Sequence, residues 1–248
     1  MFETHWVPPP PHLGLIVEEA HVWRVALAGD TAQAERYWPT LSRDEQQRAT
    51  QLHFVSDRQR FVIARGILRE ILGRYLCLAP ADIEFAYESR GKPRLPKCAS
   101  LRFNLAHSHE LALIVVARER EVGIDVEQIC AAIEAQTLSA QFFAPTEVQA
   151  LDALPVTERL PAFFRCWTRK EAYLKAIGAG LFKPLDQFAV SLAPGQAAAL
   201  LEVKWSEAET QRWSLWHLDV GPHYAAALAV EGRLARLCCW QWTHATTD

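Results

Sequence analysis

The stretch VGIDVE, Val122–Glu127, lies near the middle of the chain and has the character of a strand. Its β-branched residues alternate in the manner of a half-buried strand. Residues two apart in a strand share a face, so Asp125 and Glu127 point the same way, roughly 7 Å apart. Neighbouring carboxylates repel unless a cation or a proton neutralises them. The stretch therefore predicts either a site for a hard metal ion or an edge strand with an acidic solvent face.

The composition is that of a soluble globular protein. Of the 248 residues, 50% are hydrophobic and 22% are charged, which excludes a disordered chain. The net charge of −3 gives no reason to expect bulk binding to nucleic acid or membrane. No apolar run approaches the ~18 residues of a membrane span, and prolines interrupt the N-terminal segment where a signal peptide would need apolar residues. We expect a cytosolic protein whose cysteines are reduced, because none forms a CxxC pair.

The order of predicted elements occurs twice along the chain. Each half offers a strand, a helical region with one long helix, and several further strands. The expected helical segments are 40–52, 56–75, 133–154 and 157–178, and the expected strands are 17–27, 101–118 (two strands), 122–129, 188–192, 212–220, 224–230 and 234–242. This pattern predicts an α+β fold of two similar halves, 1–118 and 119–248, that meet near residues 115 to 125. A ligand is expected in the cleft between them.

Two further clusters carry chemistry-bearing side chains. Glu171 and Lys175 lie four apart in a predicted helix and share a face, as members either of a site or of an ordinary surface ion pair. Lys92 and Arg94 lie on one turn, and His107 lies beside another. Each cluster alone is compatible with a purely structural role.

Taken together, four motifs resemble one family. They are GKPRL (91–95), RFNLAHS (102–108), VGIDVE (122–127) and WTRKEAYLKAIGAGL (167–181). In this order and spacing they resemble the 4'-phosphopantetheinyl transferases, and more closely the double-length Sfp type that acts on carrier proteins. The resemblance extends over roughly residues 40 to 190.

The resemblance implies two similar α+β halves in a pseudo-twofold arrangement, with coenzyme A and Mg²⁺ bound in the cleft. The first half would bind coenzyme A, and the second would hold the metal and the catalytic residues. By motif match, Asp125, Glu127 and Glu171 would be the metal ligands, and Mg²⁺ or Mn²⁺ would suit such oxygen ligands. The implied phosphate contacts are Lys175, Lys170, His107, Lys92 and Arg60, with Arg43 or Arg48 as alternatives to Arg60 at the 3'-phosphate.

The implied reaction is displacement at phosphorus. A serine hydroxyl of an apo acyl or peptidyl carrier protein attacks the β-phosphate of coenzyme A, and adenosine 3',5'-bisphosphate leaves. Glu171, directly or through a metal-bound water, is the expected general base, and Lys175 the expected catalytic cation. Two alternatives are a coenzyme A-binding protein with a decayed site and a Mg²⁺-dependent phosphohydrolase. Ala106 departs from the family pattern, where serine is common, so we expect reduced contact with the coenzyme there.

The resemblance also predicts the partner. Carrier proteins would dock near residues 128 to 160, where Phe142 and Phe143 are candidates for contact and internal packing is the alternative. Because one chain holds both halves, we expect a monomer. The pathway that the carrier serves is not encoded in these motifs.

Overall fold

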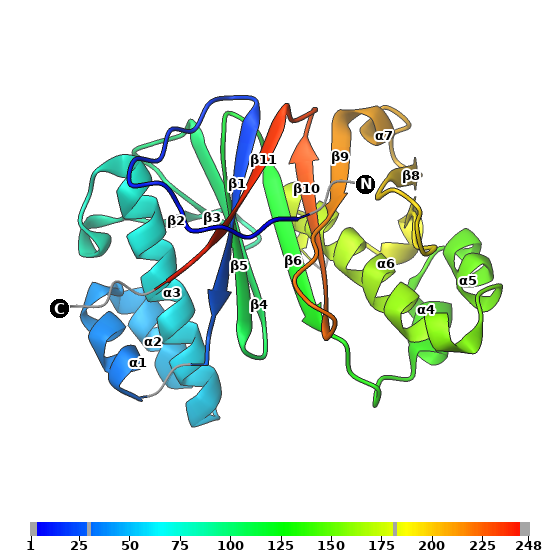
Figure 1. Cartoon of the computed structure of the whole chain (residues 1–248), viewed down its shortest axis with the longest axis horizontal. Coiled ribbons are helices and arrows are strands. Elements are labelled where there is room, and N and C mark those ends of the chain that lie inside the picture. Colours follow the sequence, from blue (N-terminus) through cyan, green and yellow to red (C-terminus); the bar gives the residue numbers. More distant parts are fainter. Residues whose placement is uncertain (1–3, 29–30, 181–182, 244–248) are drawn as a thin grey trace.

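The first half of the protein is an antiparallel sheet covered on its outer face by helices (Figure 1). In this computed structural model, residues 4–28, 31–180 and 183–243 are described. The half contains β1 (Glu19–Ala26), α1 (Thr31–Tyr37), α2 (Arg43–Gln51), α3 (Val55–Leu76), β2 (Ala86–Tyr87), β3 (Pro93–Arg94), β4 (Leu101–Ser108) and β5 (Leu111–Arg118). The apolar stripe of α3 packs on the outer face of the sheet, in one core that includes Ile67, Leu68, Trp23 and Ile114.

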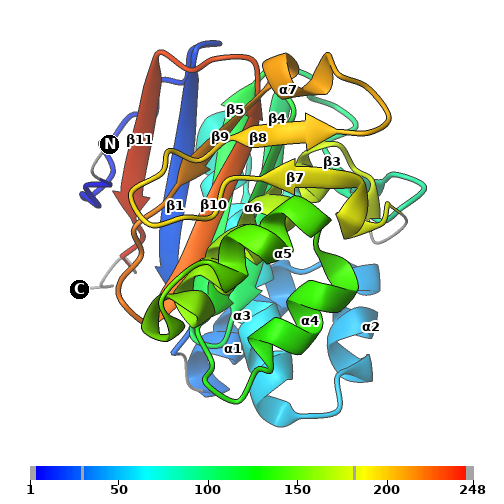
Figure 2. The same ribbon diagram turned by 90° about the vertical axis from the view of Figure 1, so that its right-hand side faces the viewer.

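The second half repeats this arrangement. It contains β6 (Val122–Gln128), α4 (Ala135–Phe142), α5 (Pro145–Asp152), α6 (Val156–Ala176), β7 (Phe188–Val190), β8 (Leu200–Val203), α7 (Glu209–Arg212), β9 (Trp213–His217) and β10 (Tyr224–Glu231). Helices α4 and α5 and the β7–β8 ribbon lie outside α6 (Figure 2). The predicted helical region 133–154 is two helices, because Pro145 fits the first turn of α5 but cannot continue α4.

The two halves have matching topologies. The order β1-α3-β4-β5 in the first half corresponds to β6-α6-β9-β10 in the second, and the sheet orders β1-β5-β4 and β6-β10-β9 correspond strand for strand. All four of these strand pairings are antiparallel. The predicted α+β fold of two similar halves is therefore confirmed.

Each half also buries one glutamate in the same way. Glu45 and Glu147 both occupy the third position of a short helix, where the carboxylate accepts a hydrogen bond from the N-cap backbone N–H. Each carboxylate then pairs with the adjacent long helix: Glu45 with Arg65 and Arg69, and Glu147 with Lys170. This buried pairing ties a peripheral helix to the long helix in both halves.

The inner faces of the two sheets pack together, with the helices outside (Figure 1). The two sheets meet where β4 runs beside β6. There Asn104 Oδ1 accepts a hydrogen bond from Ile124 N at 2.9 Å, and Ser108 Oγ accepts one from Gln128 N at 3.0 Å. Two side chains on one face of β4 thus satisfy backbone donors of β6 that would otherwise lack partners.

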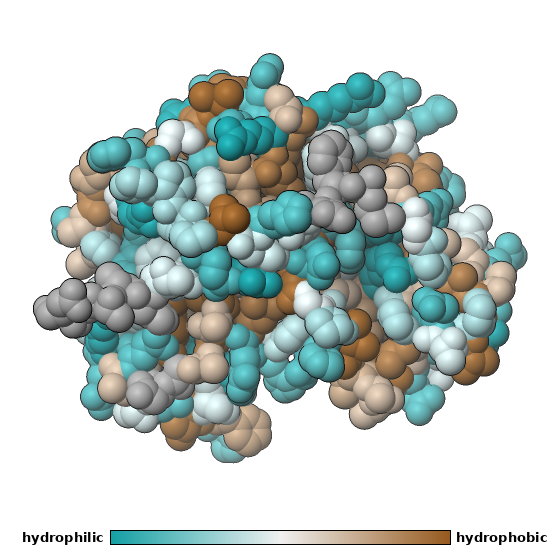
Figure 3. Space-filling model, in the orientation of Figure 1, coloured by the Kyte–Doolittle hydropathy of each residue, from teal (hydrophilic) through white to brown (hydrophobic). Residues whose placement is uncertain are grey.

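The last strand of the chain, β11 (Arg236–Gln241), joins the sheet of the first half. It runs parallel to β1, and Cys238 lies opposite His21 in the register. Residues 119–248 therefore contain the whole second half together with one strand of the first sheet. The face of the molecule in Figure 3 is mostly hydrophilic, with apolar residues in separate patches. Within the ranges described, the helices are too short or too polar for any of them to traverse a lipid bilayer.

Candidate active site

Gly123 sets the distance between β6 and α6. A Cβ atom at this position would overlap Ala172 O and the backbone of Ala176 in α6. Glycine therefore lets the helix backbone approach the strand closely. The result is that the side chain of Lys175, one turn beyond Ala172, reaches Asp125 on β6.

Asp125 is the centre of the site. Its side chain is 3% exposed, and Lys175 Nζ donates a hydrogen bond to Asp125 Oδ1 at 2.6 Å. The other oxygen, Oδ2, is buried without a partner among the described residues. Burial raises the pKa of Asp125, while the charge of Lys175 opposes that shift. One carboxylate oxygen is thus left available for a further cation.

Two more carboxylates, Glu127 and Glu171, lie within the electrostatic influence of Asp125. Burial and the charge of Asp125 raise the pKa of Glu127 to about 7, although Ser108 donates a hydrogen bond to Glu127 Oε2 at 3.0 Å. Burial and Asp125 also raise the pKa of Glu171. Three partly buried acids that repel one another form an electrostatic environment that favours a proton or a positive ion.

The donor set fits a hard divalent cation by its chemistry. As the side chains lie, no group of three or more His, Cys, Asp or Glu residues in the described ranges is gathered closely enough to hold a metal ion. In this arrangement the ammonium of Lys175 neutralises Asp125. Asp125 Oδ2 has no described partner, and negative charge is crowded at Glu127 and Glu171, as their raised pKa values show; a bound Mg²⁺ or Mn²⁺ would relieve this crowding.

Two basic side chains of the first half, His107 and Arg60, lie close enough to Lys175 or to each other to interact electrostatically. His107 is near the end of β4, where its side chain reaches solvent. Desolvation by its surroundings lowers the pKa of His107, and the positive charge of Lys175 lowers it further. Arg60 on α3 lowers it as well, and Asp57 has the opposite effect. Arg60 itself lies 3.4 Å from Asp57. The structure thus brings Arg60, His107 and Lys175 into one electrostatic neighbourhood.

Lys170 is a correction to the predicted phosphate contacts. Its ammonium is fully buried, 2.7 Å from Glu147 Oε2, and donates hydrogen bonds to Leu185 O at 2.8 Å and Phe188 O at 2.5 Å. An α-helix turns about 100° per residue, so Lys170 cannot share the face of Glu171 and Lys175. Its role is structural, and it corresponds to Arg69 of the first half.

Lys92 has oxygen partners of its own in this structure, and its contact with a phosphate stays a prediction. Its side chain is 8% exposed, and its ammonium bonds to Glu121 Oε2 at 3.0 Å, Val122 O at 3.2 Å and Ala176 O at 2.8 Å. With three oxygen partners, this lysine joins the 88–94 turn to β6 and to the end of α6. A phosphate could bind the ammonium only by displacing these oxygens.

The alternatives to Arg60 are both exposed on α2. Arg43 lies at its first turn, and Arg48 stacks over the Tyr87 ring at 4.2 Å. Ala106 is 5% exposed and belongs to the core between the sheets. Strand residues alternate between faces, so position 106 lies on the same face of β4 as Ser108, which touches Glu127. The reduced contact with the coenzyme at Ala106 stays a prediction.

Sequence analysis did not single out Ser108 and Asn104, although both lie in RFNLAHS. They are four residues apart, which places them on one face of β4, the face that bonds to β6. This even spacing of polar residues in an apolar strand was the available signal. Ser108 also touches Glu127, so it belongs to the site itself.

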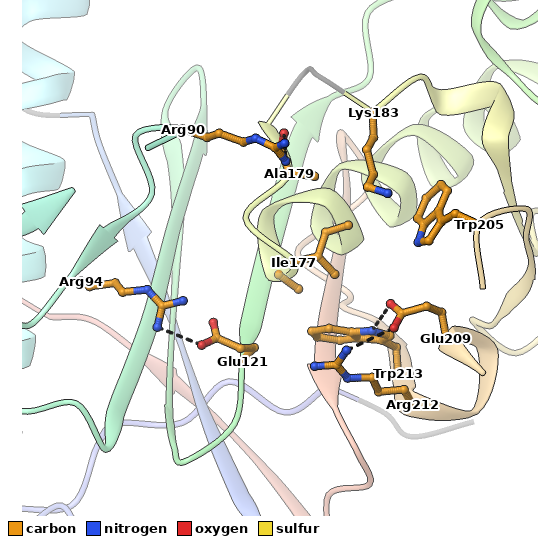
Figure 4. A pocket seen from close by; sticks show the side chains of 11 residues that line it. Arg90, Arg94, Glu121, Ile177, Ala179, Lys183, Trp205, Glu209, Arg212 and Trp213 are labelled. Carbon is orange, nitrogen blue, oxygen red and sulfur yellow. Dashed lines mark hydrogen bonds and ion pairs between the residues drawn. The ribbon is translucent and has the colours of Figure 1, made fainter. Parts of the chain in front are cut away.

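A separate hollow lies between the halves at the other end of β6 (Figure 4). It has a volume of about 280 Å³ and lies beside Glu121 and the C-terminal end of α6. Its carboxylates are already paired, Glu121 with Arg94 at 3.0 Å and Glu209 with Arg212 at 3.2 Å. Lys183 lies 3.6 Å from the centroid of the Trp205 ring. This hollow has no carboxylate cluster comparable to that at Asp125.

Comparison with known proteins identifies the family. The sequence profile of the 4'-phosphopantetheinyl transferase superfamily matches residues 121–229, and that of the 4'-phosphopantetheinyl transferase N-terminal region matches residues 30–121. The 4'-phosphopantetheinyl transferase HetI of Nostoc sp. is 41% identical over 94% of this chain and 96% of that protein. A putative 4'-phosphopantetheinyl transferase of Synechocystis sp. is 35% identical over 72% of each chain. The Sfp transferase of Bacillus subtilis is 28% identical over 64% of this chain and 69% of its own. The chain therefore belongs to the 4'-phosphopantetheinyl transferase superfamily.

Proposed function

We propose that the protein transfers the 4'-phosphopantetheine moiety of coenzyme A to a serine of an apo acyl or peptidyl carrier protein, with a divalent cation at Asp125, Glu127 and Glu171. The observation that carries the proposal is the buried Asp125 carboxylate. One oxygen is bonded to Lys175 and the other has no described partner. The carboxylates of Glu127 and Glu171 interact electrostatically with Asp125, and both have raised pKa values.

Each residue has a defined part in the reaction. Lys175 from the second half, and His107 and Arg60 from the first, bind and orient the phosphates of coenzyme A. A bound Mg²⁺ or Mn²⁺ would supply neutralisation of charge on the diphosphate. Glu171 accepts the proton of the attacking serine, a role that its raised pKa favours.

The bond changes balance without any further reactant. The serine Oγ forms a bond to the β-phosphorus, and the bond from that phosphorus to the bridging oxygen breaks. The bridging oxygen leaves with adenosine 3',5'-bisphosphate, and the serine proton passes to Glu171 and then to solvent. The positive charge of Lys175 stabilises the charge that develops on the leaving phosphate, and the imidazole of His107 donates a hydrogen bond to it.

Carrier docking is part of the proposal, with one change from the expected contacts. Phe143 is 3% exposed and stacks on Phe163 with ring centroids 5.2 Å apart, so it is a core residue. Phe142 is 37% exposed and contacts the edge of Trp167. We expect Phe142→Ala to raise the KM for the carrier and leave the KM for coenzyme A unchanged. Leu201→Ala, which removes an exposed apolar side chain of β8, is the control; equal effects of both variants would contradict docking at Phe142.

A monomer in the cytoplasm completes the proposal. One chain supplies both sides of the cleft, so the site needs no second copy, which sedimentation equilibrium with and without coenzyme A would test. The described cysteines are all free, including the adjacent Cys238 and Cys239, which is consistent with a reducing compartment.

The decisive experiment is intact-mass spectrometry of apo carrier proteins after incubation with the protein, coenzyme A and Mg²⁺. We expect a gain of one phosphopantetheine, abolished by a chelator, restored by Mg²⁺ and absent in Asp125→Asn. Coenzyme A binding without transfer to any carrier would instead support a decayed coenzyme A-binding protein. Release of adenosine 3',5'-bisphosphate without a gain in carrier mass would support a phosphohydrolase.

A further inference from the structure

A second, larger cavity lies on the far side of α6 from Asp125. It has a volume of about 960 Å³, is open to solvent, and is lined by the middle of α6, the segment 193–200 and the edge strand β9. Arg169, which lines it, and Glu171, which faces Asp125, are two residues apart, about 200° around the helix. The cavity is therefore separate from the proposed active site, and its size is in the usual range for small-molecule sites.

The cavity is positively charged. Arg165, Arg169, Arg233 and His217 line it, and none of its described lining residues is acidic. Desolvation lowers the pKa of Arg165, and desolvation and the charge of Arg165 lower the pKa of Arg169 to about 10. Desolvation, Arg169 and Arg165 also lower the pKa of His217. Glu158 opposes the shift at Arg165 and Asp219 the shift at His217, but neither acid lines the cavity, so an anion bound there would stabilise the three cations.

The guanidinium of Arg169 is fixed by hydrogen bonds to Ser191, but its Nε–H has no described acceptor. It is 2% exposed, and its Nη1 donates to Ser191 O at 2.6 Å and to Ser191 Oγ at 3.0 Å. Its Nε–H is buried without a partner among the residues described. Arg165 Nη1 donates to Leu192 O at 2.5 Å. Carbonyl and hydroxyl oxygens satisfy some donors but do not neutralise the charge, and a buried uncompensated cation is costly.

The first half of the protein has no arginines at the positions that correspond to Arg165 and Arg169. The contacts with the buried glutamates align the two long helices: Cys166 and Lys170 touch Glu147 as Arg65 and Arg69 touch Glu45. The residues immediately before them then correspond as well. Arg165 and Arg169 stand where the first half has Ala64 and Leu68, which are buried in its core. At these two positions the second half has cations beside a cavity, whereas the first half has core side chains.

The remaining walls are apolar and partly aromatic. Trp213, Leu215 and Trp216 of β9 contribute, with Leu200 and a run of alanines opposite. Arginine guanidinium groups bind phosphate or carboxylate in a planar, bidentate manner, and indole rings provide flat apolar contact. We propose that this cavity is a binding site for a small organic anion that combines a phosphate or carboxylate with a planar ring.

The test uses the whole protein with its tryptophan indoles labelled with ¹⁵N and phenyl phosphate as the probe. The chain has 9 Trp, and Trp216→Phe assigns one of the two signals from β9. We expect saturable shifts of the Trp213 and Trp216 signals, with a Kd below about 1 mM. Inorganic phosphate and benzyl alcohol, which each carry one part of the chemistry, should bind at least about tenfold more weakly. Benzoate distinguishes carboxylate from phosphate as the preferred group.

Three variants decide the outcome. Arg165→Gln should weaken phenyl phosphate binding by about tenfold or more, because it removes a charge-assisted contact. Arg233→Gln, at an exposed position, should weaken it without risk to folding. Arg159→Gln is the matched control, since Arg159 also lies on α6 and also donates to backbone carbonyls, but lies outside the cavity. Absence of saturable shifts at Trp213 and Trp216, or an equal loss of affinity in all three variants, would overturn the proposal.

Discussion

Substitution of Lys170 should lower stability, whereas substitution of Lys175 should mainly lower coenzyme A affinity and transfer. Lys170→Met tests this difference most directly. Lys170 is fully buried against Glu147 and two backbone carbonyls. Methionine keeps the length of the side chain but leaves Glu147 as a buried carboxylate without its cation. Removing one partner of a buried ion pair costs about 3–5 kcal/mol. For a protein of this size that corresponds to a fall in Tm of about 6–20 °C.

Lys175→Met is the matched control. Its side chain is 31% exposed, and its partner Asp125 has a raised pKa already, so that carboxyl can take up a proton when the lysine is lost. We expect a smaller loss of stability and a large loss of coenzyme A affinity and transfer. Differential scanning calorimetry and calorimetric titration with coenzyme A measure the two quantities on the same samples. If Lys170→Met kept the wild-type Tm but lost coenzyme A affinity, the structural role of Lys170 would be refuted.

Three further predictions concern the packing of α6 on β6, the hydrogen bond between β4 and β6, and the pH dependence of stability. Gly123→Ala should destabilise by about 1–3 kcal/mol or more in urea unfolding, because its Cβ would meet the α6 backbone, whereas Gly14→Ala, with open space around it, should be nearly neutral. Asn104→Ala should lower the free energy of unfolding by about 1–3 kcal/mol and speed hydrogen exchange at the Ile124 amide, which loses its acceptor. Unchanged exchange at Ile124 would contradict the hydrogen bond between β4 and β6. Burial lowers the pKa of His21 to about 4, so below about pH 6.5 the unfolded state binds a proton that the native state does not, and stability should fall as pH falls from about 6.5 to 4. The urea midpoint of His21→Gln should depend less on pH over that range, and an equal slope in both proteins would exclude His21 as its source.

Local sequence determined most elements and which side chains of one element share a face. The alternation in VGIDVE placed Asp125 and Glu127 on one strand face, and helical spacing placed Glu171 with Lys175. The long helices α3 and α6 and the strands β4, β5 and β6 follow from periodicity, which depends only on neighbours along the chain. The short helix α1 and strand β8 were not predicted, since each is stabilised by packing more than by its own pattern.

What only the tertiary structure decided is which partner each side chain meets. The sequence shows two lysines five residues apart, but the rotation of α6 against β6, set by the close approach at Gly123, sends Lys175 to Asp125 and Lys170 to Glu147. The pairing of β11 with β1 leaves no local trace either, because a hydrogen-bonded ladder between segments more than 200 residues apart depends on the path of the whole chain. Periodicity fixes which face of an element is apolar, and only the assembled fold fixes what that face touches.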